Sequence, residues 1–201
     1  VNLSELGYDL SFLRTIPGTI GGAIAMNAGC YGNYIGDYVQ SIEGFDKSGK
    51  FIRVSRKKIQ FKYRSSGLPK NFIVTSAVLK PKIEKTSVIQ LKMQEMLSKR
   101  EETQPTKKAT CGSTFKNPDG KSSLISETSI ELKAWNLIDR AGLRGKKLGR
   151  AMVSKKHPNF LINLGGATAE DMEALGEYVR KSVYEKFKVS LDWEVIRVGR
   201  K

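Results

Sequence analysis

The chain has 201 residues, 39% of them hydrophobic and 27% charged, which excludes a disordered chain and allows one large domain or two small ones. Two cysteines far apart and a single histidine exclude a zinc site of usual ligand spacing and favour a reducing, cytoplasmic location. The net charge of +15 fits nucleic acid, phosphorylated small molecules or a lysine-rich surface with no partner, and it does not decide among them.

The first feature along the chain is an uncharged, glycine-rich segment over residues 15–36. Its asparagines, proline and six glycines make it too polar and too broken to span a membrane, so we expect no membrane insertion. The segment lacks the glycine spacing of a dinucleotide fingerprint or a P-loop. Its glycines would still let backbone amides approach a phosphate or a flat ring closely. A tightly packed turn and a cofactor-binding loop are therefore equal alternatives from the spacing alone.

Hydrophobic patterns predict the elements that follow in the first half of the chain. Strands are expected at 39–45 and 51–54, joined by a hairpin turn, and a further strand at 72–79. An amphipathic helix is expected from Thr86 to about Arg100. The polar stretch 101–110 after it is the best candidate for a boundary region.

The second half mixes helices and strands in the same way. A helix is expected over 134–141, a short strand over 159–163, and a helix that begins at the capping signal of Thr168 and ends near Phe187. An alternating strand over 189–195 closes the chain. Because strands and helices do not alternate regularly, the pattern predicts an α+β fold.

The stretch "CGSTFKNPDG", residues 111–120, places a serine hydroxyl beside a lysine. Taken alone, Ser113 is a turn residue. Together with "IPGTIGGAIAMNAGCYG" and the closing "LDWEVIRVG", however, "CGSTFKNP" resembles the UDP-N-acetylenolpyruvoylglucosamine reductase family of flavoenzymes. The resemblance continues in consistent order through "FKYRSS", "TQP", "LIDRAGLRGKKLG", "VSKKHPNFLIN" and "GGATAEDM".

The resemblance implies a reaction and a domain organisation. In that family NADPH and FAD reduce UDP-N-acetylglucosamine-enolpyruvate to UDP-N-acetylmuramate for peptidoglycan synthesis. Residues 1–86 would be the second lobe of a two-lobed FAD-binding domain, and residues 87–201 a smaller α+β substrate-binding domain. The chain would lack the N-terminal part of the FAD-binding region, which makes its own flavin affinity and activity an open point.

The resemblance also implies roles for individual residues. Hydride delivered to C3 of the enol ether leaves negative charge at C2, and this enolate must be stabilised and protonated. Arg64 would pair with the substrate carboxylate, Ser113 would supply the proton, and Glu194 would assist with charge or proton handling. Alone, these three would be a surface arginine, a turn serine and a solvated glutamate. Residues implied to contact the flavin are Gly18, Thr19, Gly21, Gly22, Asn27, Ala28 and Gly29; those implied to contact the substrate are Tyr63, Lys116, Asn117, Arg144 and His157.

Two departures from the family pattern and one rival function stand beside this interpretation. Residues 119–131 are expected to form a surface insertion near the site, and Trp193 stands where a proline is common. The rival is a non-catalytic basic module for nucleotide-sugars or nucleic acid. No aromatic-interleaved or zinc-finger pattern accompanies the lysines, so we expect the enolpyruvyl sugar nucleotide and NADPH as partners rather than nucleic acid.

Overall fold

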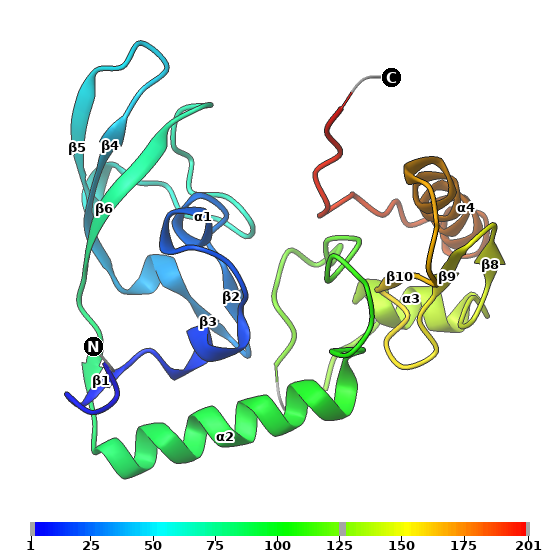
Figure 1. Ribbon diagram of the computed structural model, residues 1–201, viewed down its shortest axis with the longest axis horizontal. Coiled ribbons are helices and arrows are strands. Elements are labelled where there is room, and N and C mark those ends of the chain that lie inside the picture. The colour runs from blue at the N-terminus through cyan, green and yellow to red at the C-terminus, as the bar shows by residue number, and fades with distance from the viewer. Residues whose placement is uncertain (1–2, 125–127, 200–201) are drawn as a thin grey trace. The chain divides into compact units, whose positions relative to one another are not determined.

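The computed structural model describes residues 3–124 and 128–199 and divides into two compact units (Figure 1). The first unit contains residues 1–99 with 122–125, and the second contains residues 100–121 with 126–201. Each unit has its own hydrophobic core. Both mix helices with antiparallel strands, which agrees with the expected α+β class. The division at residues 86 and 87 stays a prediction about functional domains.

A three-stranded antiparallel sheet forms the frame of the first unit. Its central strand β4 (Val39–Phe45) pairs with β5 (Phe51–Ser55) on one side and β6 (Ile73–Leu79) on the other, as the blue-to-green ribbons in Figure 1 show. Helix α1 (Ile20–Ala25), inside the glycine-rich segment, packs against β6. The sequence analysis did not predict this helix, because two of its six residues are glycine and weaken the helical signal.

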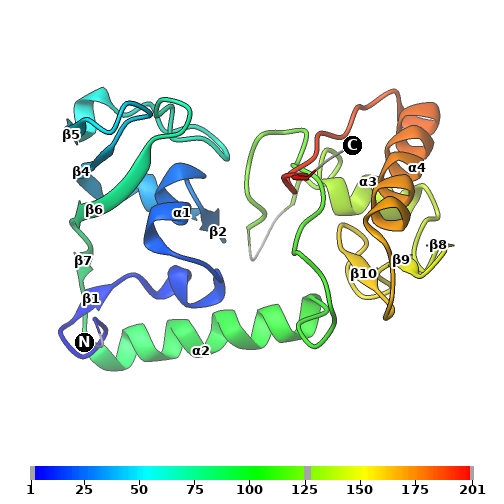
Figure 2. The same ribbon diagram turned by 45° about the horizontal axis from the view of Figure 1, so that its top comes forward.

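Short elements complete the first unit. Strand β1 (Tyr8–Asp9) pairs with β7 (Lys82–Ile83) (Figure 2), and β2 (Gly29–Cys30) pairs with β3 (Asn33–Tyr34) (Figure 1). Short 3-10 helices cover Ser11–Thr15, Ile35–Asp37 and Arg56–Lys58.

Helix α2 spans Thr86–Thr103, which confirms the predicted helix, but its apolar residues are only weakly gathered on one face and Leu91 is exposed. Its first turns are tied to the first unit through Lys92, whose ammonium lies 2.7 Å from the Asp9 carboxylate. Ile89 and Met96 supply its buried face. No helix in the described residues is long and apolar enough to cross a membrane.

The second unit packs two helices against a small sheet. The strands are β8 (Lys147–Leu148), β9 (Ala151–Val153) and β10 (Leu161–Asn163), and the helices are α3 (Ala134–Arg140) and α4 (Ala169–Phe187) (Figure 2). The core between them includes the apolar residues Leu137, Val153, Leu161, Leu175, Val179 and Leu191. The capping box predicted at Thr168 and Asp171 is present at the start of α4.

One expectation for the second half needs correction. The predicted closing strand 189–195 is not formed, because only Trp193 makes a bridge, to Phe115 in an irregular segment that offers no continuous ladder. The described residues of the predicted surface insertion 119–131 are mostly exposed or half-buried, and Ser122 is packed, since it is 6% exposed and donates its hydroxyl to the Gly29 carbonyl. Residues 125–127 of that insertion lie outside the described part of the chain.

Candidate functional site

The "GSTFK" segment lies in an extended conformation between two other segments of the second unit. On one side Ser113 bridges Phe160, and the Thr114 amide donates a 2.7 Å hydrogen bond to the Asn159 carbonyl. On the other side the Lys116 amide donates to the Asp192 carbonyl at 2.8 Å. The segment is therefore held on both edges by backbone hydrogen bonds.

Buried side chains fix this arrangement further. The Asn159 side chain, 4% exposed, accepts from the Phe115 amide at 3.0 Å and donates to the Phe115 carbonyl at 2.8 Å. Thr114 is 1% exposed, and its hydroxyl accepts a hydrogen bond from the Leu161 amide at 3.3 Å. Because these polar groups are buried and paired, displacing the segment would leave several of them unsatisfied.

The structure brings Ser113 and Glu194 to the same short stretch of backbone. The Glu194 amide donates a 2.8 Å hydrogen bond to the carbonyl of Thr114, the residue next to Ser113. Both residues are half-buried, so both are within reach of solvent or a ligand. Among the described residues, the Ser113 hydroxyl has no hydrogen-bond partner. The backbones of Ser113 and Glu194 thus lie on neighbouring segments of the second unit.

Lys116 and Asn117 follow Ser113 and differ in their surroundings. The Lys116 side chain is half-buried and forms no ion pair with another described residue. The Asn117 side chain donates to the Lys121 carbonyl at 2.7 Å and accepts from the Ala134 amide at 3.1 Å. Asn117 therefore closes the 117–121 loop and holds it to the first turn of α3.

A buried lysine that the sequence analysis missed supports the same loop. The Lys133 side chain is fully buried, and its ammonium lies 2.8 Å from the Asp119 carboxylate and 3.3 Å from the Lys121 carbonyl. A buried lysine needs such partners, because an unpaired ammonium is costly to remove from water. No sequence signal separates it from the exposed lysines of this basic chain.

Arg144, expected to contact the substrate, is engaged inside the protein. Its guanidinium holds the Asp139 carboxylate at 2.6 and 2.8 Å and donates to the carbonyls of Lys155 and Lys156 at 2.7 and 3.1 Å. Hydrogen bonding to Arg144 lowers the pKa of Asp139 below its ordinary value. Arg144 thus shapes the 155–156 turn.

His157 follows that turn and is mostly buried. Its ring makes edge contacts with Phe160 at 4.7 Å and Trp135 at 6.5 Å between centroids, and its Nδ1 is buried without a hydrogen-bond partner among the described residues. Burial, and secondarily the charge of Arg144, lower the pKa of His157 to about 4. The imidazole is neutral at pH 7.

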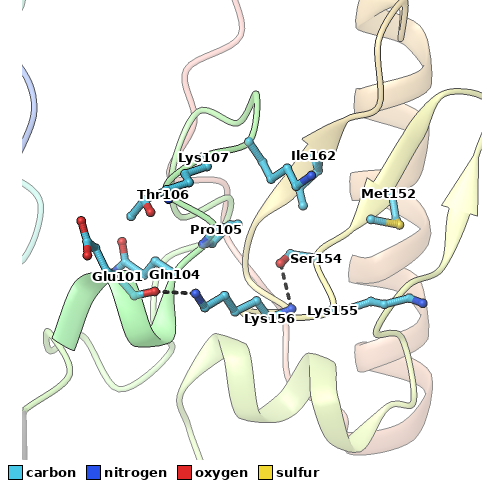
Figure 3. A pocket seen from close by; sticks show the side chains of 11 residues that line it. Glu101, Gln104, Pro105, Thr106, Lys107, Met152, Ser154, Lys155, Lys156 and Ile162 are labelled. Carbon is cyan, nitrogen blue, oxygen red and sulfur yellow. Dashed lines mark hydrogen bonds between the residues drawn. The ribbon is translucent and has the colours of Figure 1, made fainter. Parts of the chain in front are cut away.

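A lysine-rich pocket of about 520 Å³ lies in the second unit (Figure 3). The stretch 104–108 forms one wall, and β9, β10 and the 154–156 turn form the other. Ser154, in that turn, donates its amide to the carbonyl of Phe160, the bridge partner of Ser113. Four lysines line the pocket, namely Lys107, Lys108, Lys155 and Lys156, against one carboxylate, Glu101. Lys156 extends its ammonium to the Glu101 carbonyl. The pocket can accept an anionic ligand.

The glycine segment of the first unit presents an accessible turn before α1. Thr19 caps α1 by accepting a 3.1 Å hydrogen bond from the Gly22 amide. Gly18 has a φ of +134°, and a Cβ placed on it would meet no atom within 4 Å. Gly21 lies against β6, where a Cβ would come within 3.2 Å of the Val74 carbonyl oxygen. The turn at 18–19 is therefore open, whereas Gly21 serves close packing.

The second half of the glycine segment is a buried scaffold. Asn27 is 6% exposed, and its side chain donates to the Lys62 carbonyl and accepts from the Gly36 amide, both at 3.0 Å. The Ala28 amide donates to the Ala23 carbonyl at 2.7 Å. Gly29 is required at its position, because a Cβ would lie 2.4 Å from the Asn33 carbonyl oxygen.

Tyr63 and Arg64 lie in the first unit beside this scaffold. The Arg64 guanidinium lies 4.8 Å from the Tyr63 ring centroid and donates a 3.5 Å hydrogen bond to the Gly29 carbonyl. Arg64 has a φ of +53°, an uncommon value for a residue with a side chain. The expected flavin residues, Tyr63 and Arg64 thus share one unit, and Ser113, Lys116, Asn117, Arg144, His157 and Glu194 share the other. The described residues contain no cluster of potential metal ligands.

Comparisons with known proteins agree on one family. The family description "UDP-N-acetylenolpyruvoylglucosamine reductase, C-terminal domain" matches residues 104–198. The chain is 50% identical over 198 residues to the reductase of that name from Paracoccus denitrificans, covering 98% of this chain and 65% of that protein. It is 50% identical over 195 residues to the Dinoroseobacter shibae reductase, covering 96% and 64%.

A solved structure gives the same result. The UDP-N-acetylenolpyruvylglucosamine reductase from Thermus caldophilus matches with a TM-score of 0.78 and 35% identity over 95% of this chain and 65% of that one. The chain thus spans just under two thirds of the length of these relatives.

Proposed function

Because the chain belongs to the UDP-N-acetylenolpyruvoylglucosamine reductase family, we propose that it contributes to the NADPH- and FAD-dependent reduction of UDP-N-acetylglucosamine-enolpyruvate in peptidoglycan synthesis. The observation that carries this proposal is the placement of Ser113 and Glu194 on either side of the Thr114 carbonyl, in a segment clamped by buried hydrogen bonds. Both residues hold the positions that the family resemblance assigns to proton and charge handling.

The reduction adds one hydride and one proton across the enolpyruvyl double bond. FAD, when bound, supplies the hydride, with NADPH as the source of electrons. Hydride addition at C3 leaves an electron pair at C2, which is shared with the carboxylate. Ser113 donates its hydroxyl proton to C2 and regains one from solvent. An enolate carbon is basic enough to accept a proton from a positioned hydroxyl, so Ser113 needs no histidine beside it.

Charge on the enolate must be stabilised as the proton is transferred. Arg64 suits this task, because a guanidinium is always charged and binds a carboxylate through two parallel hydrogen bonds. Glu194 is half-buried beside the Ser113 segment and relays from solvent the proton that restores the Ser113 hydroxyl.

The open turn at Gly18 and Thr19 fits a flavin. With no atom within 4 Å of a Cβ at Gly18, the backbone amides there are accessible to a phosphate or a ring edge. Asn27, Ala28 and Gly29 act through the scaffold that supports this turn, since their polar groups are paired within the unit. We propose a two-lobed FAD-binding domain to which residues 1–86 contribute.

The lysine-rich pocket fits the diphosphate of the sugar nucleotide. Lys107, Lys108 and Lys155 line it and form no ion pair with another described residue, which leaves them available to phosphate oxygens. The turn held by Arg144 forms its rim and leads through Ser154 to Phe160, the bridge partner of Ser113. The pocket wall is therefore connected to the Ser113 segment through the backbone of Ser154 and Phe160.

Calorimetric titration with UDP-N-acetylglucosamine tests this function. We expect binding by the full chain, and a loss of at least tenfold in affinity for the double variant Lys107→Ala and Lys155→Ala. The matched control is Lys47→Ala with Lys181→Ala, which removes the same charge from exposed positions outside the pocket. Equal losses in both variants, or steeply salt-dependent binding of DNA with no binding of the sugar nucleotide, would favour the rival basic module.

A further inference from the structure

Trp193, the residue before Glu194, makes four separate contacts, two of them with helix α4. Its indole Nε1–H donates a 2.9 Å hydrogen bond to the Glu177 carboxylate. The centroid of its ring lies 5.1 Å from that of the Phe115 ring. The Arg197 guanidinium lies over the Trp193 ring, 4.9 Å from its centroid. The fourth contact is with Gly176.

Gly176 provides the space that the indole occupies. A Cβ placed on Gly176 would lie 2.0 Å from Cη2 and 2.5 Å from Cζ2 of Trp193, a separation that no real side chain tolerates. Glycine weakens a helix interior by roughly 1 kcal/mol relative to alanine. Its presence in the middle of α4 is explained by the close approach of the Trp193 ring.

The acceptor of the indole hydrogen bond is itself held in place. Burial raises the pKa of Glu177, but hydrogen bonds from Trp193 and Arg180 outweigh it and lower the pKa below its ordinary value. Arg197 approaches the same carboxylate at 3.6 Å. An ionised, fixed carboxylate is a strong and directional acceptor for an indole N–H.

Backbone hydrogen bonds on both sides of Trp193 also hold Glu194 in place. Lys116 donates to the carbonyl of Asp192 at 2.8 Å, and Glu194 donates to the carbonyl of Thr114 at 2.8 Å, so Trp193 lies between two backbone hydrogen bonds to the "GSTFK" segment. Adjacent side chains of an extended segment point to opposite faces. With the indole fixed on α4, the Glu194 side chain faces away from that helix.

We propose that Trp193 is a positioning residue, which acts through Glu194 by locking the 192–194 segment to α4 at Gly176 and Glu177. The proposal rests on the proposed function of Glu194. Removing the lock lets Glu194 shift relative to Ser113. A misplacement of about 1 Å in a catalytic constellation costs up to roughly a hundredfold in rate.

Two variants test the lock. Trp193→Phe keeps an aromatic ring and removes the N–H donor, whereas Gly176→Ala pushes the ring out of its place. We expect both to move the Glu194 amide resonance in the ¹H–¹⁵N spectrum, and Gly176→Ala also to move the Trp193 indole N–H resonance. Tyr184→Phe is the matched control, since it removes a polar hydrogen from an exposed ring on the same helix and should move neither.

Kinetics of the flavin-loaded chain provide the second readout. We expect both variants to slow oxidation of the flavin by the enolpyruvyl substrate tenfold or more, with its reduction by NADPH unchanged. An unmoved Glu194 resonance in Gly176→Ala, or an equal loss in both half-reactions, overturns the proposal. If the chain retains no flavin, the resonances decide alone.

The Glu194→Gln variant separates this proposal from the function on which it rests. If Glu194→Gln slows substrate reduction and the Trp193 and Gly176 variants do not, only the positioning role fails. If Glu194→Gln leaves substrate reduction unchanged, the proposed role of Glu194 fails with it.

Discussion

The Glu194 amide donates a 2.8 Å hydrogen bond to the carbonyl of Thr114, the residue that follows Ser113. This one bond joins two segments that are about 80 residues apart in the chain and holds the backbone of Glu194 against the segment that contains Ser113. Buried partners on Thr114 and Asn159 hold the serine side of the pair, and α4 holds the glutamate side through Trp193.

Replacing Ser113 with alanine should remove the proton donor. We expect substrate reduction by the flavin-loaded chain to fall roughly a hundredfold or more, because a general acid contributes about 10²–10⁴-fold. Binding of UDP-N-acetylglucosamine should be unchanged. The measurement is substrate-dependent NADPH oxidation, with Ser129→Ala, at an exposed serine, as the control. Wild-type turnover in Ser113→Ala would rule out the serine as the acid.

Removing Asp119 from its ion pair with Lys133 should destabilise the protein more than removing Lys133. Asp119→Asn leaves a fully buried ammonium without its anion and should lower the free energy of unfolding by about 3 kcal/mol. Lys133→Met leaves a carboxylate that is 23% exposed, so its cost should be smaller. Urea unfolding measures both, with Lys121→Met, at an exposed lysine, as the control. Equal, small effects would mean that the ammonium is hydrated rather than buried.

His157 should make the protein less stable in acid. Its pKa is about 4 in the folded chain and about 6.5 in the unfolded chain, so the unfolded state binds more protons between these values. Stability from the neutral imidazole is therefore complete above pH 6.5 and is lost as the pH falls towards 4, by about 3 kcal/mol in total. Between pH 7 and pH 4.5, the free energy of unfolding should fall more in wild type than in His157→Gln. An equal fall in both proteins, or titration of the single imidazole near pH 6.5 by NMR, would refute burial as the cause.

Arg144 should affect nucleotide binding through the pocket rim. Because Arg144 holds the carbonyls of Lys155 and Lys156, Arg144→Lys should weaken UDP-N-acetylglucosamine binding several-fold by loosening that turn. Asp139→Asn should act in the same direction, since the Asp139 carboxylate orients the guanidinium. Calorimetry distinguishes this role from direct contact: if Arg144 binds the ligand itself, releasing it from Asp139 would raise the affinity.

Local signals in the sequence predicted much of the fold. Helix α4 begins at Thr168 as expected, because its capping box involves only residues three apart. Helix α2 and the hairpin of β4 and β5 follow from local apolar patterns in the same way. These elements depend on neighbours along the chain, which is the information that a single sequence carries.

Features that depend on distant residues were not predictable. The alternating pattern of 189–195 predicts a strand, but its partner at Phe115 allows a single bridge. No local sequence pattern indicates that Gly176 makes room for an indole 17 positions later. None indicates that Lys133 is buried and not exposed. The candidate site residues came from the family resemblance, and their catalytic and binding roles stay predictions. The structure adds which partners hold each of them.

The most direct test of the proposed function is a ¹H–¹⁵N chemical-shift map of the chain titrated with UDP-N-acetylglucosamine-enolpyruvate. The account predicts saturable shifts at Ser113, Lys116 and Glu194 and in the two walls of the pocket at 104–108 and 154–156. The shift changes at these residues should persist at high salt, whereas shift changes at exposed lysines elsewhere should decrease. Shifts confined to exposed lysines, or none at Ser113 and Glu194, would contradict a sugar-nucleotide site in the second unit.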